Sequence, residues 1–161
     1  MRIGTGFDVH KFADTKADQI RIGGVDVPHD RAVLAHSDGD VVLHALCDAM
    51  LGALALGDIG HHFPDTDQDF ADIDSRELLR QVAQLIADKG YQLGNADITL
   101  IAQTPRVAGY VEAMRQTIAT DVDTAIGNIS VKATTTEKLG FVGRSEGLAA
   151  EAVVLLQVIE A

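Results

Sequence analysis

The run Ala149-Ala150-Glu151-Ala152-Val153-Val154-Leu155-Leu156 decides how this chain must fold. Successive side chains of a strand point to opposite faces of its sheet, and toward its end this run is apolar on both faces. One face can pack against helices of the same chain, whereas the other needs a separate cover. A second subunit is the simplest cover, so we expect a homo-oligomer; an ordinary two-sided core within one chain is the alternative.

Strand-like alternation and helix-like spacing predict the other elements. Runs with strand character cover residues 2–10, 20–27, 96–103, 129–134 and 148–159. Apolar stripes at helical spacing cover residues 37–56, 75–89 and 107–120. Their order favours the α+β class: a two-layer sandwich with a mainly antiparallel four-stranded sheet and helices on one face.

Short polar pairs mark where the first two helices are expected to begin. Ser37 with Asp40, and Asp74 with Glu77, have the three-residue spacing of capping pairs. Residues 58–73, between these helices, are polar and contain Gly and Pro. They therefore predict a long loop, and long loops in compact domains are usually functional or disordered.

Composition narrows the class of protein. The 161 residues fit one domain, and the 47% hydrophobic content with 4% aromatics predicts a core of Ala, Val, Ile and Leu. A net charge of −11 argues against nucleic acid as a partner. The longest apolar stretch, residues 45–56, is too short to span a membrane, and residues 1–10 lack the apolar segment of a secretory signal. Cys47 is the only cysteine, which fits a buried apolar position and the reducing cytoplasm.

Three residues have the character of metal ligands. If residues 7–10 are extended, Asp8 and His10 point to the same face of the strand. A helix beginning near residue 37 places His44 in its second turn, where the imidazole can face that strand. Two histidines and one carboxylate are typical of a catalytic zinc-type site with an open position. The alternative is a surface aspartate with two histidines satisfied by other hydrogen bonds.

The second ring nitrogen of a ligating histidine usually has its own hydrogen-bond partner. Asp40 and Asp48 lie one turn either side of His44, and either carboxylate could accept from that nitrogen. For Asp40, capping of the helix is the alternative role.

Several long motifs, in one order along the whole chain, resemble those of the 2-C-methyl-D-erythritol 2,4-cyclodiphosphate synthases. The motifs are Gly6-Phe7-Asp8-Val9-His10, Ala35-His36-Ser37-Asp38-Gly39-Asp40, Gly57-Asp58-Ile59-Gly60, Phe63-Pro64-Asp65-Thr66-Asp67 and Lys132-Ala133-Thr134-Thr135-Thr136-Glu137-Lys138-Leu139-Gly140-Phe141.

The resemblance implies a fold, an assembly and a reaction. It implies ferredoxin-like subunits in a homotrimer, with each active site between neighbouring subunits. The implied enzyme is a phosphorus–oxygen lyase of the non-mevalonate route to isoprenoids. The 2-phosphate of 4-diphosphocytidyl-2-C-methyl-D-erythritol 2-phosphate attacks the β-phosphorus of the same molecule. The products are 2-C-methyl-D-erythritol 2,4-cyclodiphosphate and CMP.

The resemblance also assigns metal ligands and catalytic residues. It implies that Asp8, His10 and His44 bind Zn²⁺, and that Glu137 holds Mg²⁺ or Mn²⁺ together with the substrate diphosphate. His36 and Thr135 are implied to stabilise the transition state.

Substrate-binding residues follow from the same motifs. Ser37 is implied to contact the 2-phosphate. The remaining contacts implied for the ribose, the methylerythritol, the cytosine and the phosphates come from Asp58, Ile59, Gly60, Phe63, Pro64, Asp65, Thr66, Asp67, Ala102, Gln103, Thr104, Pro105, Arg106, Val107, Ala108, Thr134, Thr136, Phe141 and Arg144. Without the resemblance, the acidic segment among them would be interpreted as a solvated loop.

Two positions depart from the usual family pattern. Thr5 stands where the family often has histidine, and Arg106 where it often has lysine. An arginine differs from a lysine in shape, so Arg106 need not keep the same phosphate contact.

Arg144 supports one further hypothesis. In some members the equivalent arginines meet at the threefold axis, at the end of an apolar channel, so this chain is expected to be able to hold an isoprenoid diphosphate near Arg144 and Phe141. The alternative is a salt-bridge network between Arg144 and Glu151 of different subunits.

Two rival functions use the same residues differently. A zinc-dependent phosphatase or nucleotide hydrolase would place water at the open metal position. A non-catalytic isoprenoid-binding trimer would use the metal only structurally.

Overall fold

The computed structural model describes residues 1–64 and 73–159. The strands are β1 (Arg2–Lys16), β2 (Gln19–Ile22), β3 (Val25–Pro28), β4 (Arg31–Leu34), β5 (Tyr91–Ile101), β6 (Ile129–Thr134) and β7 (Gly147–Val158). The helices are α1 (Val41–Ala53), α2 (Ile59–His62), α3 (Ser75–Asp88), α4 (Val111–Asp121), α5 (Gly140–Gly143) and a 3-10 turn (Ile126–Asn128). Among the described residues, no helix is both long enough and apolar enough to cross a membrane.

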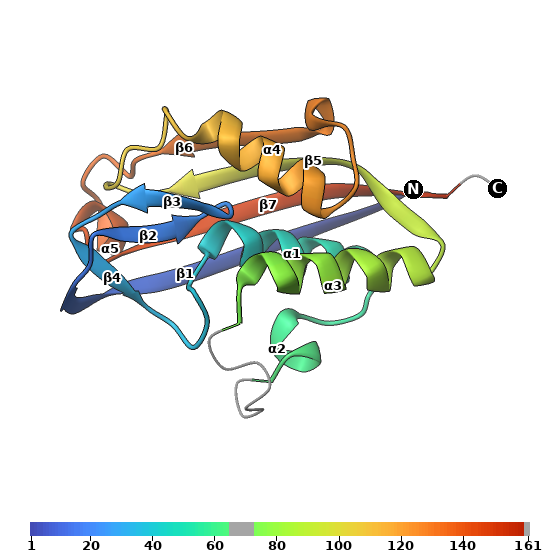
Figure 1. Ribbon diagram of the computed structural model, residues 1–161, viewed down its shortest axis with the longest axis horizontal. Helices are drawn as coiled ribbons and strands as arrows, with labels where there is room; N and C mark the ends of the chain where they lie inside the picture. Colours follow the sequence, from blue (N-terminus) through green and yellow to red (C-terminus); the bar gives the residue numbers. More distant parts are fainter. Residues whose placement is uncertain (65–72, 160–161) are drawn as a thin grey trace.

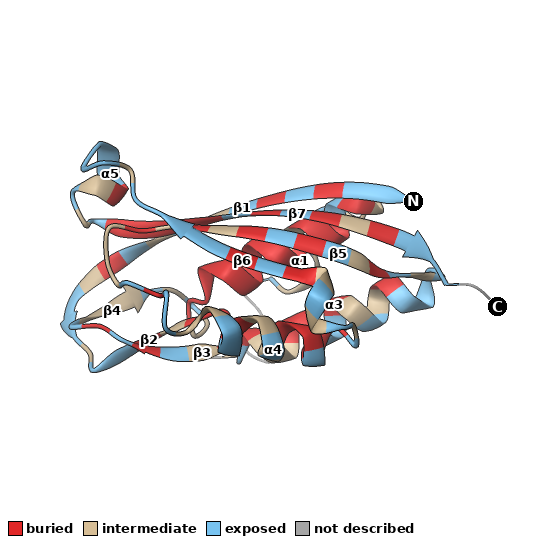
Figure 2. Cartoon of the chain, turned by 90° about the horizontal axis from the view of Figure 1, so that it is seen from above, coloured by how far each residue is buried: buried red, intermediate tan, exposed pale blue. Residues whose placement is uncertain are grey.

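The chain forms two layers (Figure 1). One is a five-stranded sheet in the order β4-β1-β7-β5-β6, and the other contains α1, α3, α4 and the β2–β3 hairpin (Figure 2). Strand β7 lies at the centre, antiparallel to both β1 and β5, and β5 pairs with β6 in parallel. The α+β class is therefore confirmed, but the expected four-stranded sheet is wrong, because the short strand β4 adds a fifth strand at the edge.

Strand β1 and helix α1 approach each other unusually closely. A Cβ atom at Gly4 would lie 1.9 Å from the carbonyl oxygen of Ala49, and one at Gly6 would lie 2.0 Å from that of Ala45. The absence of side chains at these two glycines therefore lets the backbones of the strand and the helix touch. Alternation along β1 places Asp8 and His10 on this same helix-facing side.

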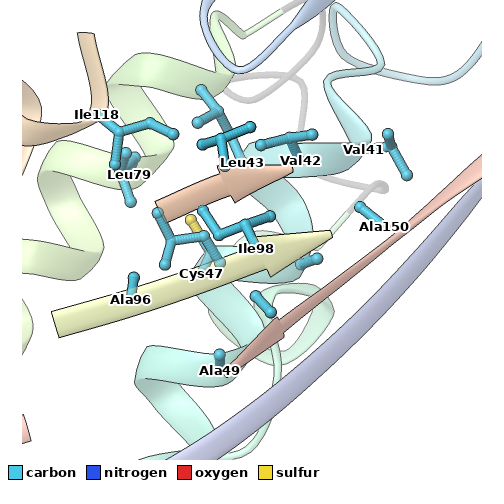
Figure 3. Packing of buried hydrophobic residues seen from close by; sticks show 14 of the residues in the cluster. Val41, Val42, Leu43, Cys47, Ala49, Leu79, Ala96, Ile98, Ile118 and Ala150 are labelled. Atoms are coloured by element: carbon cyan, nitrogen blue, oxygen red, sulfur yellow. The ribbon is translucent and has the colours of Figure 1, made fainter. Parts of the chain in front are cut away.

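Helix α1 is the centre of the core. It is buried on nearly all sides because it lies between the sheet and α3, and only Asp48 and Gly52 are not buried. Figure 3 shows Leu43 and Cys47 of α1 among Leu79 of α3 and Ile98 of β5. Burial raises the pKa of the Cys47 thiol, so this cysteine behaves as an inert apolar side chain, as the sequence predicts.

The opposite face of the sheet carries exposed apolar side chains. Ile3, Phe7 and Val9 of β1 are 71%, 58% and 45% exposed, and Val153 of β7 is 41% exposed. Helices α1, α3 and α4 lie on the other side of the sheet (Figure 2). The prediction from β7 is thus met within the chain on one face only.

Asp40, not Ser37, caps the first helix. The Asp40 side chain accepts hydrogen bonds from the backbone N–H groups of Val42 and Leu43, and α1 begins at Val41. The same carboxylate accepts from the N–H groups of Gly23 at 2.8 Å and Gly24 at 2.6 Å. The expected single strand over residues 20–27 is wrong, because Gly23 and Gly24 have φ values of 61° and 74° and form the turn of a hairpin between β2 and β3.

Other boundaries differ in detail. Helix α3 and its Asp74 cap are confirmed, although the Glu77 carboxylate pairs with Arg80 instead of completing a capping box. The third predicted helix begins at Val111, later than expected. The predicted loop over residues 58–73 contains the short helix α2, and its residues 65–72 lie outside the described part of the chain.

Candidate metal centre

Three side chains converge where β1 crosses the first turns of α1. The Asp8 Oδ2 atom lies 2.9 Å from His10 Nε2 and 3.1 Å from His44 Nδ1. The two histidine nitrogens lie 3.1 Å apart. Three potential ligand atoms therefore form a nearly equilateral triangle.

This triangle fits a divalent metal of the zinc type. A tetrahedral ion with bonds of about 2.0 Å separates its ligand atoms by about 3.3 Å, close to the edges seen here. Within the described ranges, Asp8, His10 and His44 are the group of histidine, cysteine or acidic side chains close enough to share an ion. Two imidazoles and one carboxylate leave a fourth position for an oxygen of another molecule.

The charges of the triad are coupled. Burial opposes ionisation of Asp8, but hydrogen bonds with His10 and His44 outweigh it and hold the pKa of Asp8 well below its usual range. Burial likewise opposes protonation of His44, but the Asp8 carboxylate outweighs it and raises the pKa of His44. Asp8 is therefore already ionised and loses no proton when a metal ion binds, whereas His44 must be in its neutral form to act as a ligand.

The triad opens into a cavity of about 350 Å³. Its walls include the predicted site residues His36, Ser37, Ile59, Gly60 and Phe63. They also include Ala35, which opens the motif before His36, and three residues that the sequence did not indicate: Leu34, Ile73 and Leu78. The cavity thus gathers one part of the predicted site around the triad.

The predicted loop residues next to this cavity have separate positions. The Asp58 carboxylate caps α2 by accepting from the His61 N–H group at 2.9 Å. Pro64 is the last described residue before the gap, and Asp65, Thr66 and Asp67 lie outside the described residues.

A second group of predicted site residues lies at the ends of β5 and β6. Because these strands are parallel, both end at the same edge of the sheet, and the Ala102 N–H group donates to the Thr134 carbonyl at 3.0 Å. The segment Ala102–Ala108 therefore starts beside the segment Thr134–Glu137. In this chain neither segment lines the cavity around the triad.

Two features of this second group are typical of binding sites. The side-chain oxygen of Gln103 is buried and has no hydrogen-bond partner among the described residues. Glu137 has a φ of 52°, in the left-handed region, and its carboxylate accepts from the Thr135 hydroxyl at 3.2 Å. Unsatisfied polar atoms and strained backbone cluster at binding sites.

Arg144 and Phe141 do not line the cavity around the triad, and they come directly after the second group in the chain. Phe141 is 41% exposed in α5, and Arg144 follows that helix. The guanidinium of Arg144 pairs with Glu146 at 2.8 Å within the chain. Pairing with Glu151 of another subunit stays a prediction.

The partner of the second nitrogen of His44 was not predicted. His44 Nε2 lies 2.9 Å from the hydroxyl of Ser75, and that hydroxyl donates to the carboxylate of Asp38. Neither Asp40 nor Asp48 fills this role, and for Asp40 the alternative, capping of the helix, is confirmed. Asp40 accepts backbone N–H groups, as described above, and Asp48 accepts from the Ile59 N–H group at 2.8 Å.

Comparisons with known proteins place the whole chain among close relatives. The model of the YgbB family matches residues 1–157. A 2-C-methyl-D-erythritol 2,4-cyclodiphosphate synthase from Shewanella denitrificans is 62% identical over 157 residues, covering 98% of this chain and 97% of its own.

Solved structures agree with this similarity. The bifunctional IspDF from Campylobacter jejuni is 44% identical with a TM-score of 0.93; the match covers 99% of this chain but only 42% of that one. The IspF of Plasmodium falciparum, solved as a CDP complex, is 36% identical with a TM-score of 0.85, covering 99% and 97% of the two chains.

Proposed function

The chain belongs to the YgbB family, among the 2-C-methyl-D-erythritol 2,4-cyclodiphosphate synthases, and on that premise we propose the reaction that it catalyses. It converts 4-diphosphocytidyl-2-C-methyl-D-erythritol 2-phosphate to 2-C-methyl-D-erythritol 2,4-cyclodiphosphate and CMP. The observation that carries the proposal is the triad of Asp8, His10 and His44 at the wall of a cavity. We place this reaction in the non-mevalonate route to isoprenoids and in the cytoplasm.

The reaction is an attack within one molecule. An oxygen of the 2-phosphate bonds to the β-phosphorus, the bond from that phosphorus to the oxygen of the CMP phosphate breaks, and CMP leaves with the electron pair. No water enters. The substrate must be folded so that two anionic phosphates meet, and positioning of this kind can supply about 7–11 kcal/mol of barrier reduction.

The cavity residues serve this folding. Asp8, His10 and His44 would hold the zinc-type ion, which when bound supplies a Lewis acid and a template for phosphate oxygens. His36 and Ser37, on the same wall, donate hydrogen bonds to phosphate oxygens as charge shifts during attack. Local donors are needed because the chain as a whole carries a net charge of −11 and repels an anionic substrate.

The second group supplies the nucleotide half of the site. Glu137 would hold Mg²⁺ or Mn²⁺ with the diphosphate, and Thr135 donates to the phosphate near it. The segment Ala102–Ala108 receives the cytosine, and the unpaired side-chain oxygen of Gln103 is an acceptor suited to a base. The CDP bound by the Plasmodium falciparum relative motivates this assignment.

A homotrimer brings the two groups together. The exposed apolar face formed by Ile3, Phe7, Val9 and Val153 supports association through the sheet, because contiguous apolar surface of this kind is usually covered. Each active site then combines the triad of one subunit with Glu137 of its neighbour.

Mixing two inactive variants tests the shared site. His44→Gln lacks a metal ligand and Glu137→Gln lacks the second carboxylate. If the subunits are unfolded together and reassembled in equal amounts, random assortment gives about a quarter of wild-type activity, because that fraction of sites contains both intact halves. Mixed assemblies with no activity would contradict a site between subunits.

Product analysis tests the reaction itself. We expect phosphorus NMR of protein, substrate and Mg²⁺ to show the coupled signals of a cyclic diphosphate with equimolar CMP, and no turnover after chelator treatment. CMP without the ring signals would instead identify a hydrolase. Absence of turnover in metal-loaded trimer would favour the binding protein.

A second ligand is proposed for the region around α5. We propose that an isoprenoid diphosphate binds near Arg144 and the exposed ring of Phe141, where a guanidinium adjoins apolar surface. Native mass spectrometry should show the ligand retained by the wild-type trimer and lost from Arg144→Ala. Equal retention by both proteins would refute this assignment.

A further inference from the structure

We propose that Ser75 and Asp38 are positioning residues that fix the imidazole of His44 for metal binding through a chain of hydrogen bonds with one direction. The inference rests on the proposed metal centre and concerns two residues that do not belong to the triad. It adds the start of α3, which is remote in sequence from β1 and α1, to the machinery of the site.

The direction of each hydrogen bond follows from chemistry. A histidine nitrogen that binds a metal carries no proton, so the neutral ring of His44 must carry its proton on the other nitrogen. The triad is formed by Nδ1 of His44, which leaves Nε2 as the N–H donor. Its acceptor is the Ser75 hydroxyl, 2.9 Å away.

The Ser75 hydroxyl has one proton, which forms its hydrogen bond to Asp38. The hydroxyl donates to Asp38 Oδ1, and an ionised carboxylate can only accept. Ser75 therefore cannot also donate to His44, and its lone pairs face the His44 N–H group. The chain of donors runs from His44 through Ser75 to Asp38 and cannot run in reverse.

The protein holds the end of this chain firmly. Asp38 Oδ2 also accepts from the backbone N–H of Ser75 at 3.1 Å, and Oδ1 accepts from the backbone N–H of Asp40 at 3.3 Å. The guanidinium of Arg21 lies 3.9 Å from Asp38 and partly balances its charge. Two backbone donors and one cation thus hold this carboxylate in place as the acceptor at the end of the chain.

Burial makes the chain effective. Ser75 is fully buried and His44 is 6% exposed, so water has little access to replace the serine hydroxyl. Ser37 is a weaker second acceptor, because its hydroxyl lies 3.3 Å from the same nitrogen. Removal of the Ser75 hydroxyl leaves a buried N–H group with a poor partner, and this favours the ring form that cannot bind the metal.

Zinc affinity of purified trimer, measured by competition with a chromophoric chelator, tests the inference directly. We expect Ser75→Ala to bind zinc about 10–100-fold more weakly than wild type, the usual effect of removing a partner of a ligating histidine. Asp38→Asn should act in the same direction. The double variant should lose no more affinity than the weaker-binding single variant, because both changes break one chain.

A matched control separates positioning from general damage to α3. Asp74→Ala removes the N-cap side chain of the same helix, which accepts from the Arg76 N–H group at 2.8 Å, but leaves the Ser75 hydroxyl in place. It should lower thermal stability and leave zinc affinity unchanged. Ser75→Thr, which retains a hydroxyl, should recover affinity relative to Ser75→Ala.

Proton NMR of the zinc-loaded protein gives a readout besides affinity. The His44 Nε2–H signal should be protected from exchange with water in wild type and in Asp74→Ala, and should be lost from Ser75→Ala. Wild-type zinc affinity and a protected signal in Ser75→Ala would overturn the inference alone. Failure of the wild-type protein to bind zinc would overturn the proposed metal centre, and with it this role for Ser75.

Discussion

The Asp40 carboxylate joins the β2–β3 turn to the start of α1, and its removal should be severely destabilising. It is fully buried and accepts from four backbone N–H groups, two in the β2–β3 turn and two in the first turn of α1. Asp40→Ala leaves all four donors without this acceptor. A buried unsatisfied donor costs roughly 1–3 kcal/mol, so the loss should be at least about 4 kcal/mol.

The two oxygens of Asp40 have unequal roles, which allows a sharper comparison. Oδ1 accepts from Gly23, Val42 and Leu43, whereas Oδ2 accepts from Gly24 alone. Asp40→Asn can keep the three bonds to Oδ1 but turns an NH₂ group toward the Gly24 N–H. Burial raises the pKa of Asp40, so ionisation of this carboxyl group is unfavourable, and the neutral amide avoids that penalty. We therefore expect Asp40→Asn to cost only about 1–2 kcal/mol.

Urea unfolding followed by circular dichroism, at one fixed protein concentration, measures these differences. Asp14→Asn is the matched control, because Asp14 is exposed and the same change there should leave the unfolding midpoint unaltered. A free energy of unfolding for Asp40→Ala within about 1 kcal/mol of wild type would refute the reasoning, because four unpaired buried donors should together cost more than that. So would Asp40→Asn as destabilised as Asp40→Ala.

Three further predictions test packing and charge. Gly6→Ala should lower the free energy of unfolding by roughly 1–3 kcal/mol and weaken zinc binding, since the new Cβ would lie 2.0 Å from the Ala45 carbonyl oxygen. Gly127→Ala is the control, because the new Cβ there has open space around it and should change neither quantity. Chemical denaturation and zinc titration compare the two variants. Asp121→Ala should cost about 2 kcal/mol and lower Tm by several degrees in a thermal melt, because its buried carboxylate joins two partly exposed arginines. The pKa of His44 is raised above 6.5, so protonation of its imidazole stabilises the metal-free protein below that pH, and this stabilisation is lost as the pH rises. The Tm of chelator-treated protein should therefore fall as the pH is raised. His44→Gln should lack this fall.

The metal triad was predictable because two local rules place it. Alternation along β1 puts Asp8 and His10 on one face, and a helix after residue 37 brings His44 opposite. The close approach of the β1 and α1 backbones was not predictable in the same way. Gly4 and Gly6 are weak strand formers by composition, and their importance appears only when Ala45 and Ala49 are seen against them.

The errors arose where a tertiary partner overrides a local pattern. Asp40 has the spacing of the second member of a capping pair, yet hydrogen bonds to the distant Gly23 and Gly24 make it the cap itself. Ser75 follows a capping residue and is 31 residues from His44, so no spacing along the chain connects the two. The strand β4 has only four residues, Arg31–Leu34, which is too short for the alternation that marks a strand.

Stability and metal binding share the same contacts in this protein. His44 lies one turn from the Asp40 cap, touches β1 through Asp8 and touches the start of α3 through Ser75. Each of these contacts holds two elements together and also orients a ligand. A variant that loosens α1 against β1 or α3 must therefore lower metal affinity, even where no ligand is altered. Conversely, a metal that binds only the folded arrangement stabilises all three junctions, by an amount that grows with the ratio of free metal to its dissociation constant.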